Sequence, residues 1–120
     1  TIYLPYRNDV HSDHAQIFDA SIACTKSFRH PFVKKVCVYE TLSETEFGMR
    51  TDDHGFKPNM WVDITNYIDR KIEIVKVFES EIQEHPFPRS ITCIKSLANL
   101  RGSFAGSEFA ESFICIKEII

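Results

Sequence analysis

The sequence predicts an α/β fold, because short apolar runs rich in β-branched residues alternate with longer segments of helical periodicity. Strands of a sheet that is covered on both faces appear as continuous apolar runs rather than as alternating ones. In helices that cover such a sheet, apolar residues recur at every third or fourth position. The strand-like runs occupy residues 2–6, 33–39 and 113–120, and the helical periodicity covers residues 12–28, 64–82 and 90–102.

The first helix is predicted directly after the first strand. Ser12 or Asp13 is suited to cap it, because both side chains accept hydrogen bonds from the free N–H groups of a first helical turn. The periodicity places one set of residues on a common face: Ala15, Phe18, Ile22 and Thr25, with Ile17, Ser21, Cys24 and Phe28 beside it. The helix should continue to about Phe28, before a His-Pro pair breaks it.

A buried strand and a long loop follow. Residues 33–39 form an apolar β-branched run, which predicts a strand buried on both faces. Residues 42–58 are polar and contain two glycines, which predicts a loop long enough to carry function or to move. Residues 60–64 are short and apolar, and they fit either a strand or an extended lead-in to the next helix.

The second half of the chain predicts two helices and a last strand. Residues 64–82 show the clearest helical periodicity in the sequence, and Pro86 and Pro88 follow its end. Ser90 is suited to cap a third helix, and Gly102 is suited to close it. The last strand then covers residues 113–120.

Three predicted strands form a thin sheet for three amphipathic helices. Continuous apolar strands need neighbours on both edges, so we expect residues 1–120 to form a single partial α/β domain that belongs to a larger sheet. The start at Thr1, almost inside a strand, also suggests a piece of a longer protein. An open sheet edge predicts a homo-oligomer or pairing of another strand with that edge.

Composition excludes several classes of protein. The net charge is −3 and no basic run exceeds two residues, so the electrostatic footprint of a nucleic-acid binder is absent. No apolar stretch approaches the ~20 residues that a membrane helix needs. The cysteines Cys24, Cys37, Cys93 and Cys115 include no CxxC pair. We expect free, largely buried thiols and a reducing, cytoplasmic location.

The segment from Asp9 to His14 carries the strongest chemical signal. Two imidazoles and two carboxylates follow a predicted strand and precede a predicted helix, which is where open α/β sheets place ligands. His11 and His14 could converge on one point above the strand end, while Asp9 or Asp13 orients one of the rings. The alternative is a solvated helix start, where aspartate is favoured by capping and by the helix dipole.

Other polar residues offer weaker candidates. Tyr39 and Glu40 end a predicted strand and could line a substrate pocket, or they could serve only packing. Arg89 could bind sugar hydroxyls or a phosphate group. Residues 52–54, Asp-Asp-His, could bind a metal, although a solvated turn is the more common role. Glu111 lies between aromatic residues and needs a partner if it is buried.

Six short segments of the sequence follow one another in an order that resembles the PIG-L/LmbE-like family of zinc-dependent de-N-acetylases. Each segment is a weak match alone, but together they occur in the family's order and cover nearly the whole chain. The matching segments are Asp9-Val10-His11-Ser12-Asp13-His14, residues 39–46, residues 56–64, His85-Pro86-Phe87-Pro88-Arg89-Ser90, Arg101-Gly102 and Phe109-Ala110-Glu111-Ser112-Phe113.

The resemblance implies roles for individual residues. It implies that His14 binds zinc and that His11 stabilises the oxyanion and protonates the leaving amine. It implies that Asp13 tunes His11, and it leaves Asp9 beside the site with a less defined role. One departure is serious: the family's opening His-Pro-Asp-Asp-Glu motif, which supplies two zinc ligands and the general base, does not occur in this sequence. The resemblance therefore implies the C-terminal portion of a larger α/β domain.

The implied activity is hydrolysis of the acetamide of an N-acetylated amino sugar, such as N-acetylglucosamine or its conjugate, on a Rossmann-like sheet. We expect the full-length protein to be the hydrolase and this chain alone to be inactive, with an incomplete zinc site. The alternative is a non-catalytic α/β module that folds and associates without a complete zinc site, since one histidine cannot form the usual three-ligand catalytic site.

Overall fold

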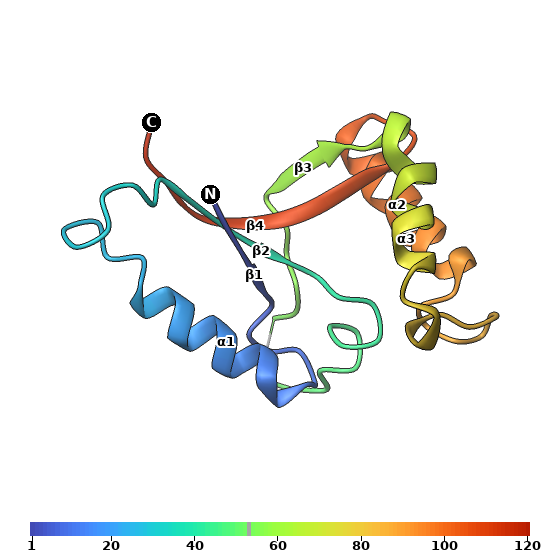
Figure 1. Ribbon diagram of the computed structural model, residues 1–120, viewed down its shortest axis with the longest axis horizontal. Coiled ribbons are helices and arrows are strands. Elements are labelled where there is room, and N and C mark those ends of the chain that lie inside the picture. Colours follow the sequence, from blue (N-terminus) through green and yellow to red (C-terminus); the bar gives the residue numbers. More distant parts are fainter. Residues whose placement is uncertain (53) are drawn as a thin grey trace. The chain divides into compact units, whose positions relative to one another are not determined.

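Four strands form one mixed sheet in the order β1-β2-β4-β3 (Figure 1). The structure is a computed structural model that describes residues 1–52 and 54–120. It confirms the predicted α/β class. The regular elements are β1 (Ile2–Pro5), α1 (Ser12–Ala23), β2 (Lys35–Tyr39), β3 (Met60–Asp63), α2 (Ile68–Lys76), α3 (Ile91–Ala105) and β4 (Ala110–Glu118).

The chain divides into two compact units. The first contains residues 1–60 and 113–120, and the second contains residues 61–112. Strand β4 contributes residues to both units, so each unit includes part of the sheet.

In the first unit, β2 is the middle strand. It pairs in parallel with β1, with Leu4 opposite Val38, and antiparallel with β4. Val36, Cys37 and Val38 are all buried, as the continuous apolar run predicted.

Helix α1 packs its apolar face on this sheet. Leu4, Val33 and Val36 form a buried cluster, against which Phe18 and Ile22 of α1 pack. Both residues belong to the helix face that the periodicity predicted, and the structure shows that this face packs on the strands. Burial of such side chains contributes roughly 1.5–3 kcal/mol each, which is what holds α1 on the strands.

Both ends of α1 differ from the prediction. The N-cap residue is His11, whose ring accepts the backbone N–H of Asp13, so capping by Ser12 or Asp13 was wrong. The helix ends at Ala23 rather than near Phe28. At that end the Thr25 hydroxyl donates to the carbonyl of Ile22, and such a local hydrogen bond competes with helical continuation.

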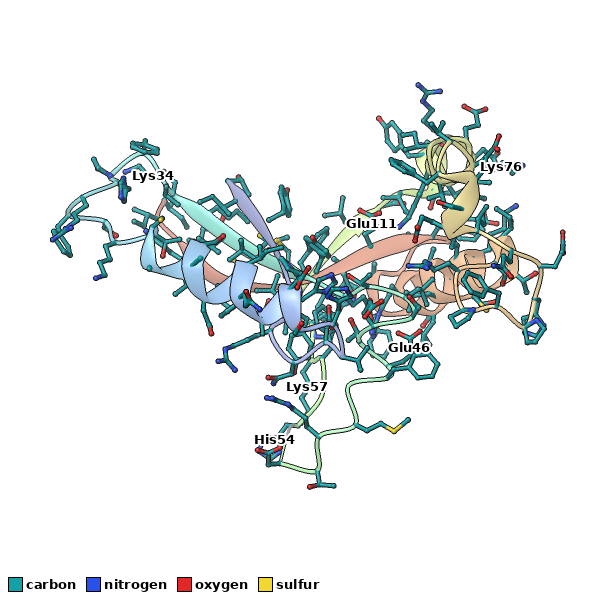
Figure 2. All side chains as sticks on the ribbon, turned by 60° about the horizontal axis from the view of Figure 1, so that its bottom comes forward. Lys34, Glu46, His54, Lys57, Lys76 and Glu111 are labelled. Atoms are coloured by element: carbon teal, nitrogen blue, oxygen red, sulfur yellow. The ribbon has the colours of Figure 1, made fainter. Side chains whose placement is uncertain are left out.

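The second unit is built around α2 and α3. Ile64, Ile68, Ile72 and Ala98 form its buried cluster. Lys71 on α2 pairs with Glu111 on β4 at 2.5 Å; Glu111, labelled in Figure 2, is partly exposed and has a cationic partner.

The predicted helix over residues 64–82 is much shorter in the structure. Thr65–Tyr67 is a 3-10 turn, and its start is fixed by Asp63, whose carboxylate accepts the Thr65 N–H. The α-helix ends at Lys76, and Val77 and Phe78 are exposed. The apolar residues past Lys76 keep the helical spacing, but Val77 and Phe78 do not pack into a core among the described residues. The periodicity therefore placed the C-terminal end of this helix wrongly.

Helix α3 begins as predicted and ends later than predicted. The Ser90 hydroxyl accepts the Cys93 N–H, which confirms the N-cap. Gly102 does not close the helix but lies buried inside it. Gly106 ends the helix with a left-handed backbone, at φ 71°, which favours glycine at this position.

Two strand assignments and one cysteine also need correction. Residues 60–63 form strand β3, so the sheet has four strands rather than three. The last strand begins at Ala110 rather than at residue 113. Cys24 is exposed rather than buried, because α1 ends before it.

No helix in the described part of the chain is long and apolar enough to cross a membrane.

Substitution Gly102→Ala should destabilise the protein by about 1–3 kcal/mol, as overpacking does. A β-carbon at this position would lie 2.6 Å from the backbone carbonyl oxygens of Ser107 and Glu108, which cannot yield as a flexible side chain would. In an open helix the same change would instead add ~1 kcal/mol of stability.

Urea unfolding followed by circular dichroism measures this effect. Ser103→Ala is the control, since Ser103 is exposed on the same helix and should shift the midpoint little. A Gly102→Ala midpoint above that of the parent chain would contradict the close packing at Gly102.

Candidate functional site

A polar cluster lies where β1 ends and α1 begins. Asp9 is its centre, and its side chain is 0% exposed. The backbone N–H of Asp9 donates to the carbonyl of Tyr6, so the chain turns sharply after the strand. A buried carboxylate is costly unless it is hydrogen-bonded, so its partners define the site.

Asp9 has two partners from different segments. One carboxylate oxygen lies 2.6 Å from Nδ1 of His14, in the first turn of α1. The other accepts the hydroxyl of Thr45 at 2.6 Å. The two short contacts satisfy both oxygens, and they join the strand end, the helix start and the loop after β2.

The loop is ordered around Thr45 by its own hydrogen bonds. The Thr45 hydroxyl accepts the N–H of Thr41 while it donates to Asp9. The N–H of Val10 donates to the carbonyl of Glu44, which ties the loop to the segment before α1. Figure 2 shows Glu46, His54 and Lys57 along the same connection between β2 and β3.

The contact with Asp9 fixes the orientation of the His14 ring. An ionised carboxylate can only accept, so Nδ1 of His14 carries the proton and Nε2 keeps its lone pair. A histidine whose Nδ1–H is held by a carboxylate is the usual arrangement of a metal-ligating histidine. The side chain is 21% exposed, so the ring edge remains accessible.

His11 has the opposite arrangement. Its Nδ1 accepts the backbone N–H of Asp13, so a neutral ring carries its proton on Nε2. The side chain is half exposed, which leaves Nε2–H able to donate to a bound group. The two rings stack at a centroid distance of 5.6 Å and an angle of 27°, so the two imidazoles are close neighbours.

Asp13 makes a weaker contact than its position in the motif indicates. Its carboxylate lies 3.9 Å from Nδ1 of His11, beyond hydrogen-bond distance, and both side chains are exposed, so this contact contributes little. The buried partner is Asp9, which acts on His14. Spacing alone did not single out this pair, because it depends on how the turn at residues 6–9 folds.

Tyr39 belongs to the same neighbourhood. Burial raises the pKa of the Tyr39 phenol, and the negative charge of Asp9 raises it further. The phenol therefore stays neutral and keeps its proton for donation. Glu40, directly after β2, is half-buried.

The remaining candidates contribute elsewhere. Arg89 lies in the second unit, where its guanidinium pairs with Glu81 at 3.0 Å and stacks over the Phe87 ring. Of the proposed Asp-Asp-His segment, His54 is exposed and Asp53 lies outside the described residues.

The described residues fit a zinc ion only in part. His14, with Asp9 behind it, suits one ligand position by its free Nε2 and its supporting carboxylate. No three His, Cys, Asp or Glu side chains gather as a metal-holding group within residues 1–52 and 54–120. A complete three-ligand site is therefore not formed by these residues.

Thr45 is the residue of the cluster to which the sequence analysis gave no role. A threonine in a polar loop has no signature of its own. Its hydroxyl matters because the loop folds back onto Asp9, 36 residues earlier in the chain.

Comparison with known proteins gives a fold and no family. No family model matches the sequence, and no curated protein matches it. Among solved structures, the chain is similar to the crystal structure of a conserved protein, TT1542, from Thermus thermophilus, with a TM-score of 0.71 and 20% identity. The match covers 98% of this chain and 52% of that one, so the chain spans about half the length of this structural relative. At this identity the likeness shows the fold alone.

The two histidines should be opposite tautomers when neutral. A long-range ¹H–¹⁵N correlation spectrum at about pH 8, above the ordinary histidine pKa, should show His14 protonated on Nδ1 and His11 protonated on Nε2. In Asp9→Asn the preference of His14 should weaken, because the amide is a poorer acceptor than the carboxylate.

His11 serves as the internal control in that variant, because its hydrogen bond comes from the backbone. An Nε2–H tautomer at His14 in the parent chain would contradict the Asp9 contact.

Proposed function

We propose that this chain is part of a zinc-dependent de-N-acetylase that hydrolyses the acetamide of an N-acetylated amino sugar or its conjugate. The support from the sequence is the ordered series of segments that resembles the PIG-L/LmbE-like family. The observation that carries the proposal is the buried Asp9 carboxylate 2.6 Å from Nδ1 of His14, which leaves Nε2 of this histidine available.

The fold is compatible with this assignment. The site lies after the carboxyl end of β1 and at the start of α1, where α/β proteins bind ligands. We propose that the four strands belong to a Rossmann-like sheet of the LmbE type, of which this chain supplies the C-terminal portion.

In the proposed enzyme, His14 would be a zinc ligand and Asp9 would hold its ring. A bound zinc ion supplies Lewis-acid polarisation of the acetamide carbonyl and activation of water. The described residues form no group of three metal ligands, so the other zinc ligands of the proposed enzyme would come from elsewhere in the full-length protein.

His11 would act on the substrate directly. With Nδ1 occupied by the Asp13 N–H, the neutral ring can donate only from Nε2. One donor suits both proposed tasks: a hydrogen bond to the oxygen that gains negative charge, followed by proton transfer to the departing amine. Tyr39 and Glu40 are proposed as substrate-binding residues, Tyr39 with a neutral hydroxyl.

The proposal is tested with the protein encoded by the complete reading frame that contains this chain. With zinc added, it should release acetate from N-acetylglucosamine conjugates. His11→Ala should lower kcat by about 10²–10³, the usual effect of losing one donor to an oxyanion. Zinc content should remain near that of the parent protein, since His11 is not a proposed ligand.

His30→Ala is the matched control, because His30 lies after α1 and contacts Phe32. It should leave kcat unchanged. A zinc-loaded parent protein that releases no acetate from any such conjugate would rule out the proposed activity.

A second candidate is a non-catalytic module that folds and associates through an open sheet edge. The observation in its favour is the absence of a three-ligand group among the described residues. For the 120-residue chain alone, calorimetric titration should show weak zinc binding that His14→Ala weakens further. Tight, stoichiometric zinc binding by the chain alone would exclude this candidate.

A further inference from the structure

Two of the four thiols face each other across the sheet. Strands β2 and β4 are neighbours in the sheet (Figure 1). Cys37 on β2 and Cys115 on β4 are direct register partners in this antiparallel pair. Both belong to the first unit. The other two cysteines, Cys24 and Cys93, lie outside the strands, in or next to helices.

The backbone around Cys115 shows which kind of pair this is. Its N–H donates to the Asn59 side-chain oxygen at 2.7 Å, and its carbonyl accepts from the Asn59 side-chain nitrogen at 3.2 Å. Two residues earlier, the carbonyl of Phe113 likewise accepts from the Asn59 backbone N–H. The backbone N–H and C=O groups of Cys115 therefore both point away from β2. This makes Cys37 and Cys115 a non-hydrogen-bonded pair of the antiparallel ladder.

This geometry suits a disulfide bond. Cα atoms of a non-hydrogen-bonded antiparallel pair lie about 4.5 Å apart, and disulfides form over Cα separations of about 4.4–6.8 Å. The register irregularity between Val36 and Cys37 leaves Cys115 opposite Cys37. The two side chains leave the same face of the sheet, as register partners do.

The two thiols differ in access. Cys37 is 0% exposed, whereas Cys115 is partly exposed, with its sulfur 3.6 Å from the Lys117 carbonyl oxygen. Burial raises the pKa of the Cys37 thiol, and the Lys35 ammonium opposes that shift. Cys115 is thus the thiol that a reagent in solution meets, and Cys37 is the thiol placed to resolve the product.

We propose that Cys37 and Cys115 form a redox-responsive site, in which a small-molecule disulfide of the glutathione type converts the two thiols into a cross-strand disulfide between β2 and β4. This site is independent of the Asp9 cluster and of the proposed hydrolase activity.

The reaction takes place in two exchange steps. The Cys115 thiolate attacks one sulfur of the small disulfide, whose S–S bond breaks and releases one small thiolate. The Cys37 thiolate then attacks the Cys115 sulfur, which forms the Cys37–Cys115 bond and releases the second small thiolate. The protein loses two electrons and two protons, and the small disulfide gains both to become two thiols.

The bond would close a loop that contains β3, α2 and α3. Closing a loop of this length removes freedom from the unfolded chain, so the oxidised protein should resist unfolding more than the reduced protein. Such a bond in a protein of a reducing compartment would be transient and regulatory rather than structural.

The test exposes the folded chain to glutathione disulfide at about pH 8.5, the ordinary thiol pKa. Free thiols are then blocked with iodoacetamide, and the protein is digested with trypsin without reductant. Mass spectrometry should find the peptide of residues 36–50 joined to that of residues 102–117, and dithiothreitol should separate them. A single glutathione adduct on Cys115 without this joined peptide would overturn the proposal.

Two variants separate the pair from ordinary thiol oxidation. Cys24→Ser removes an exposed thiol that lies outside the pair, and it should leave the joined peptide at parent levels. Cys115→Ser should abolish that peptide. Oxidation should raise the urea midpoint of the parent and Cys24→Ser proteins and leave that of Cys115→Ser unchanged; an equal rise in Cys115→Ser would overturn the proposal independently of peptide mapping.

Discussion

The candidate site depends on the burial of one carboxylate. The Asp9 side chain is 0% exposed, and an unpartnered carboxylate in such a place would cost several kcal/mol or lose its charge. The structure avoids this cost because Nδ1 of His14 lies 2.6 Å from one oxygen and the Thr45 hydroxyl donates to the other. The end of β1, the first turn of α1 and the loop after β2 are therefore held by a single group.

This arrangement also determines the chemistry that the site offers. Because Asp9 occupies Nδ1 of His14, the lone pair on Nε2 faces away from the carboxylate, as a ligand requires. Because the helix start occupies Nδ1 of His11, that ring presents a donor. Two adjacent histidines thus differ in role without any difference in residue type, and the difference comes from what each Nδ1 contacts.

Sequence patterns located most of the elements and placed their ends less well. The continuous apolar run over residues 33–39 correctly predicted a strand buried on both faces. Consecutive side chains of a strand point to opposite faces, and Val36, Cys37 and Val38 of β2 are all buried. The Ser90 cap was also predictable, since a cap depends on local hydrogen bonds. The end of α2 was not predictable, because apolar residues continue past Lys76 and periodicity does not report whether a core lies beneath them.

By itself, the sequence determined the α/β class, the order of the main elements and the concentration of imidazole and carboxylate groups at residues 9–14. Each of these depends on residues close together in the chain. Only the tertiary structure decided that Asp9, rather than Asp13, has the buried contact, that Thr45 completes it, and that Cys37 lies opposite Cys115. These pairings join residues far apart in the chain, and they arise from strand register and loop return, which no local pattern in a single sequence encodes.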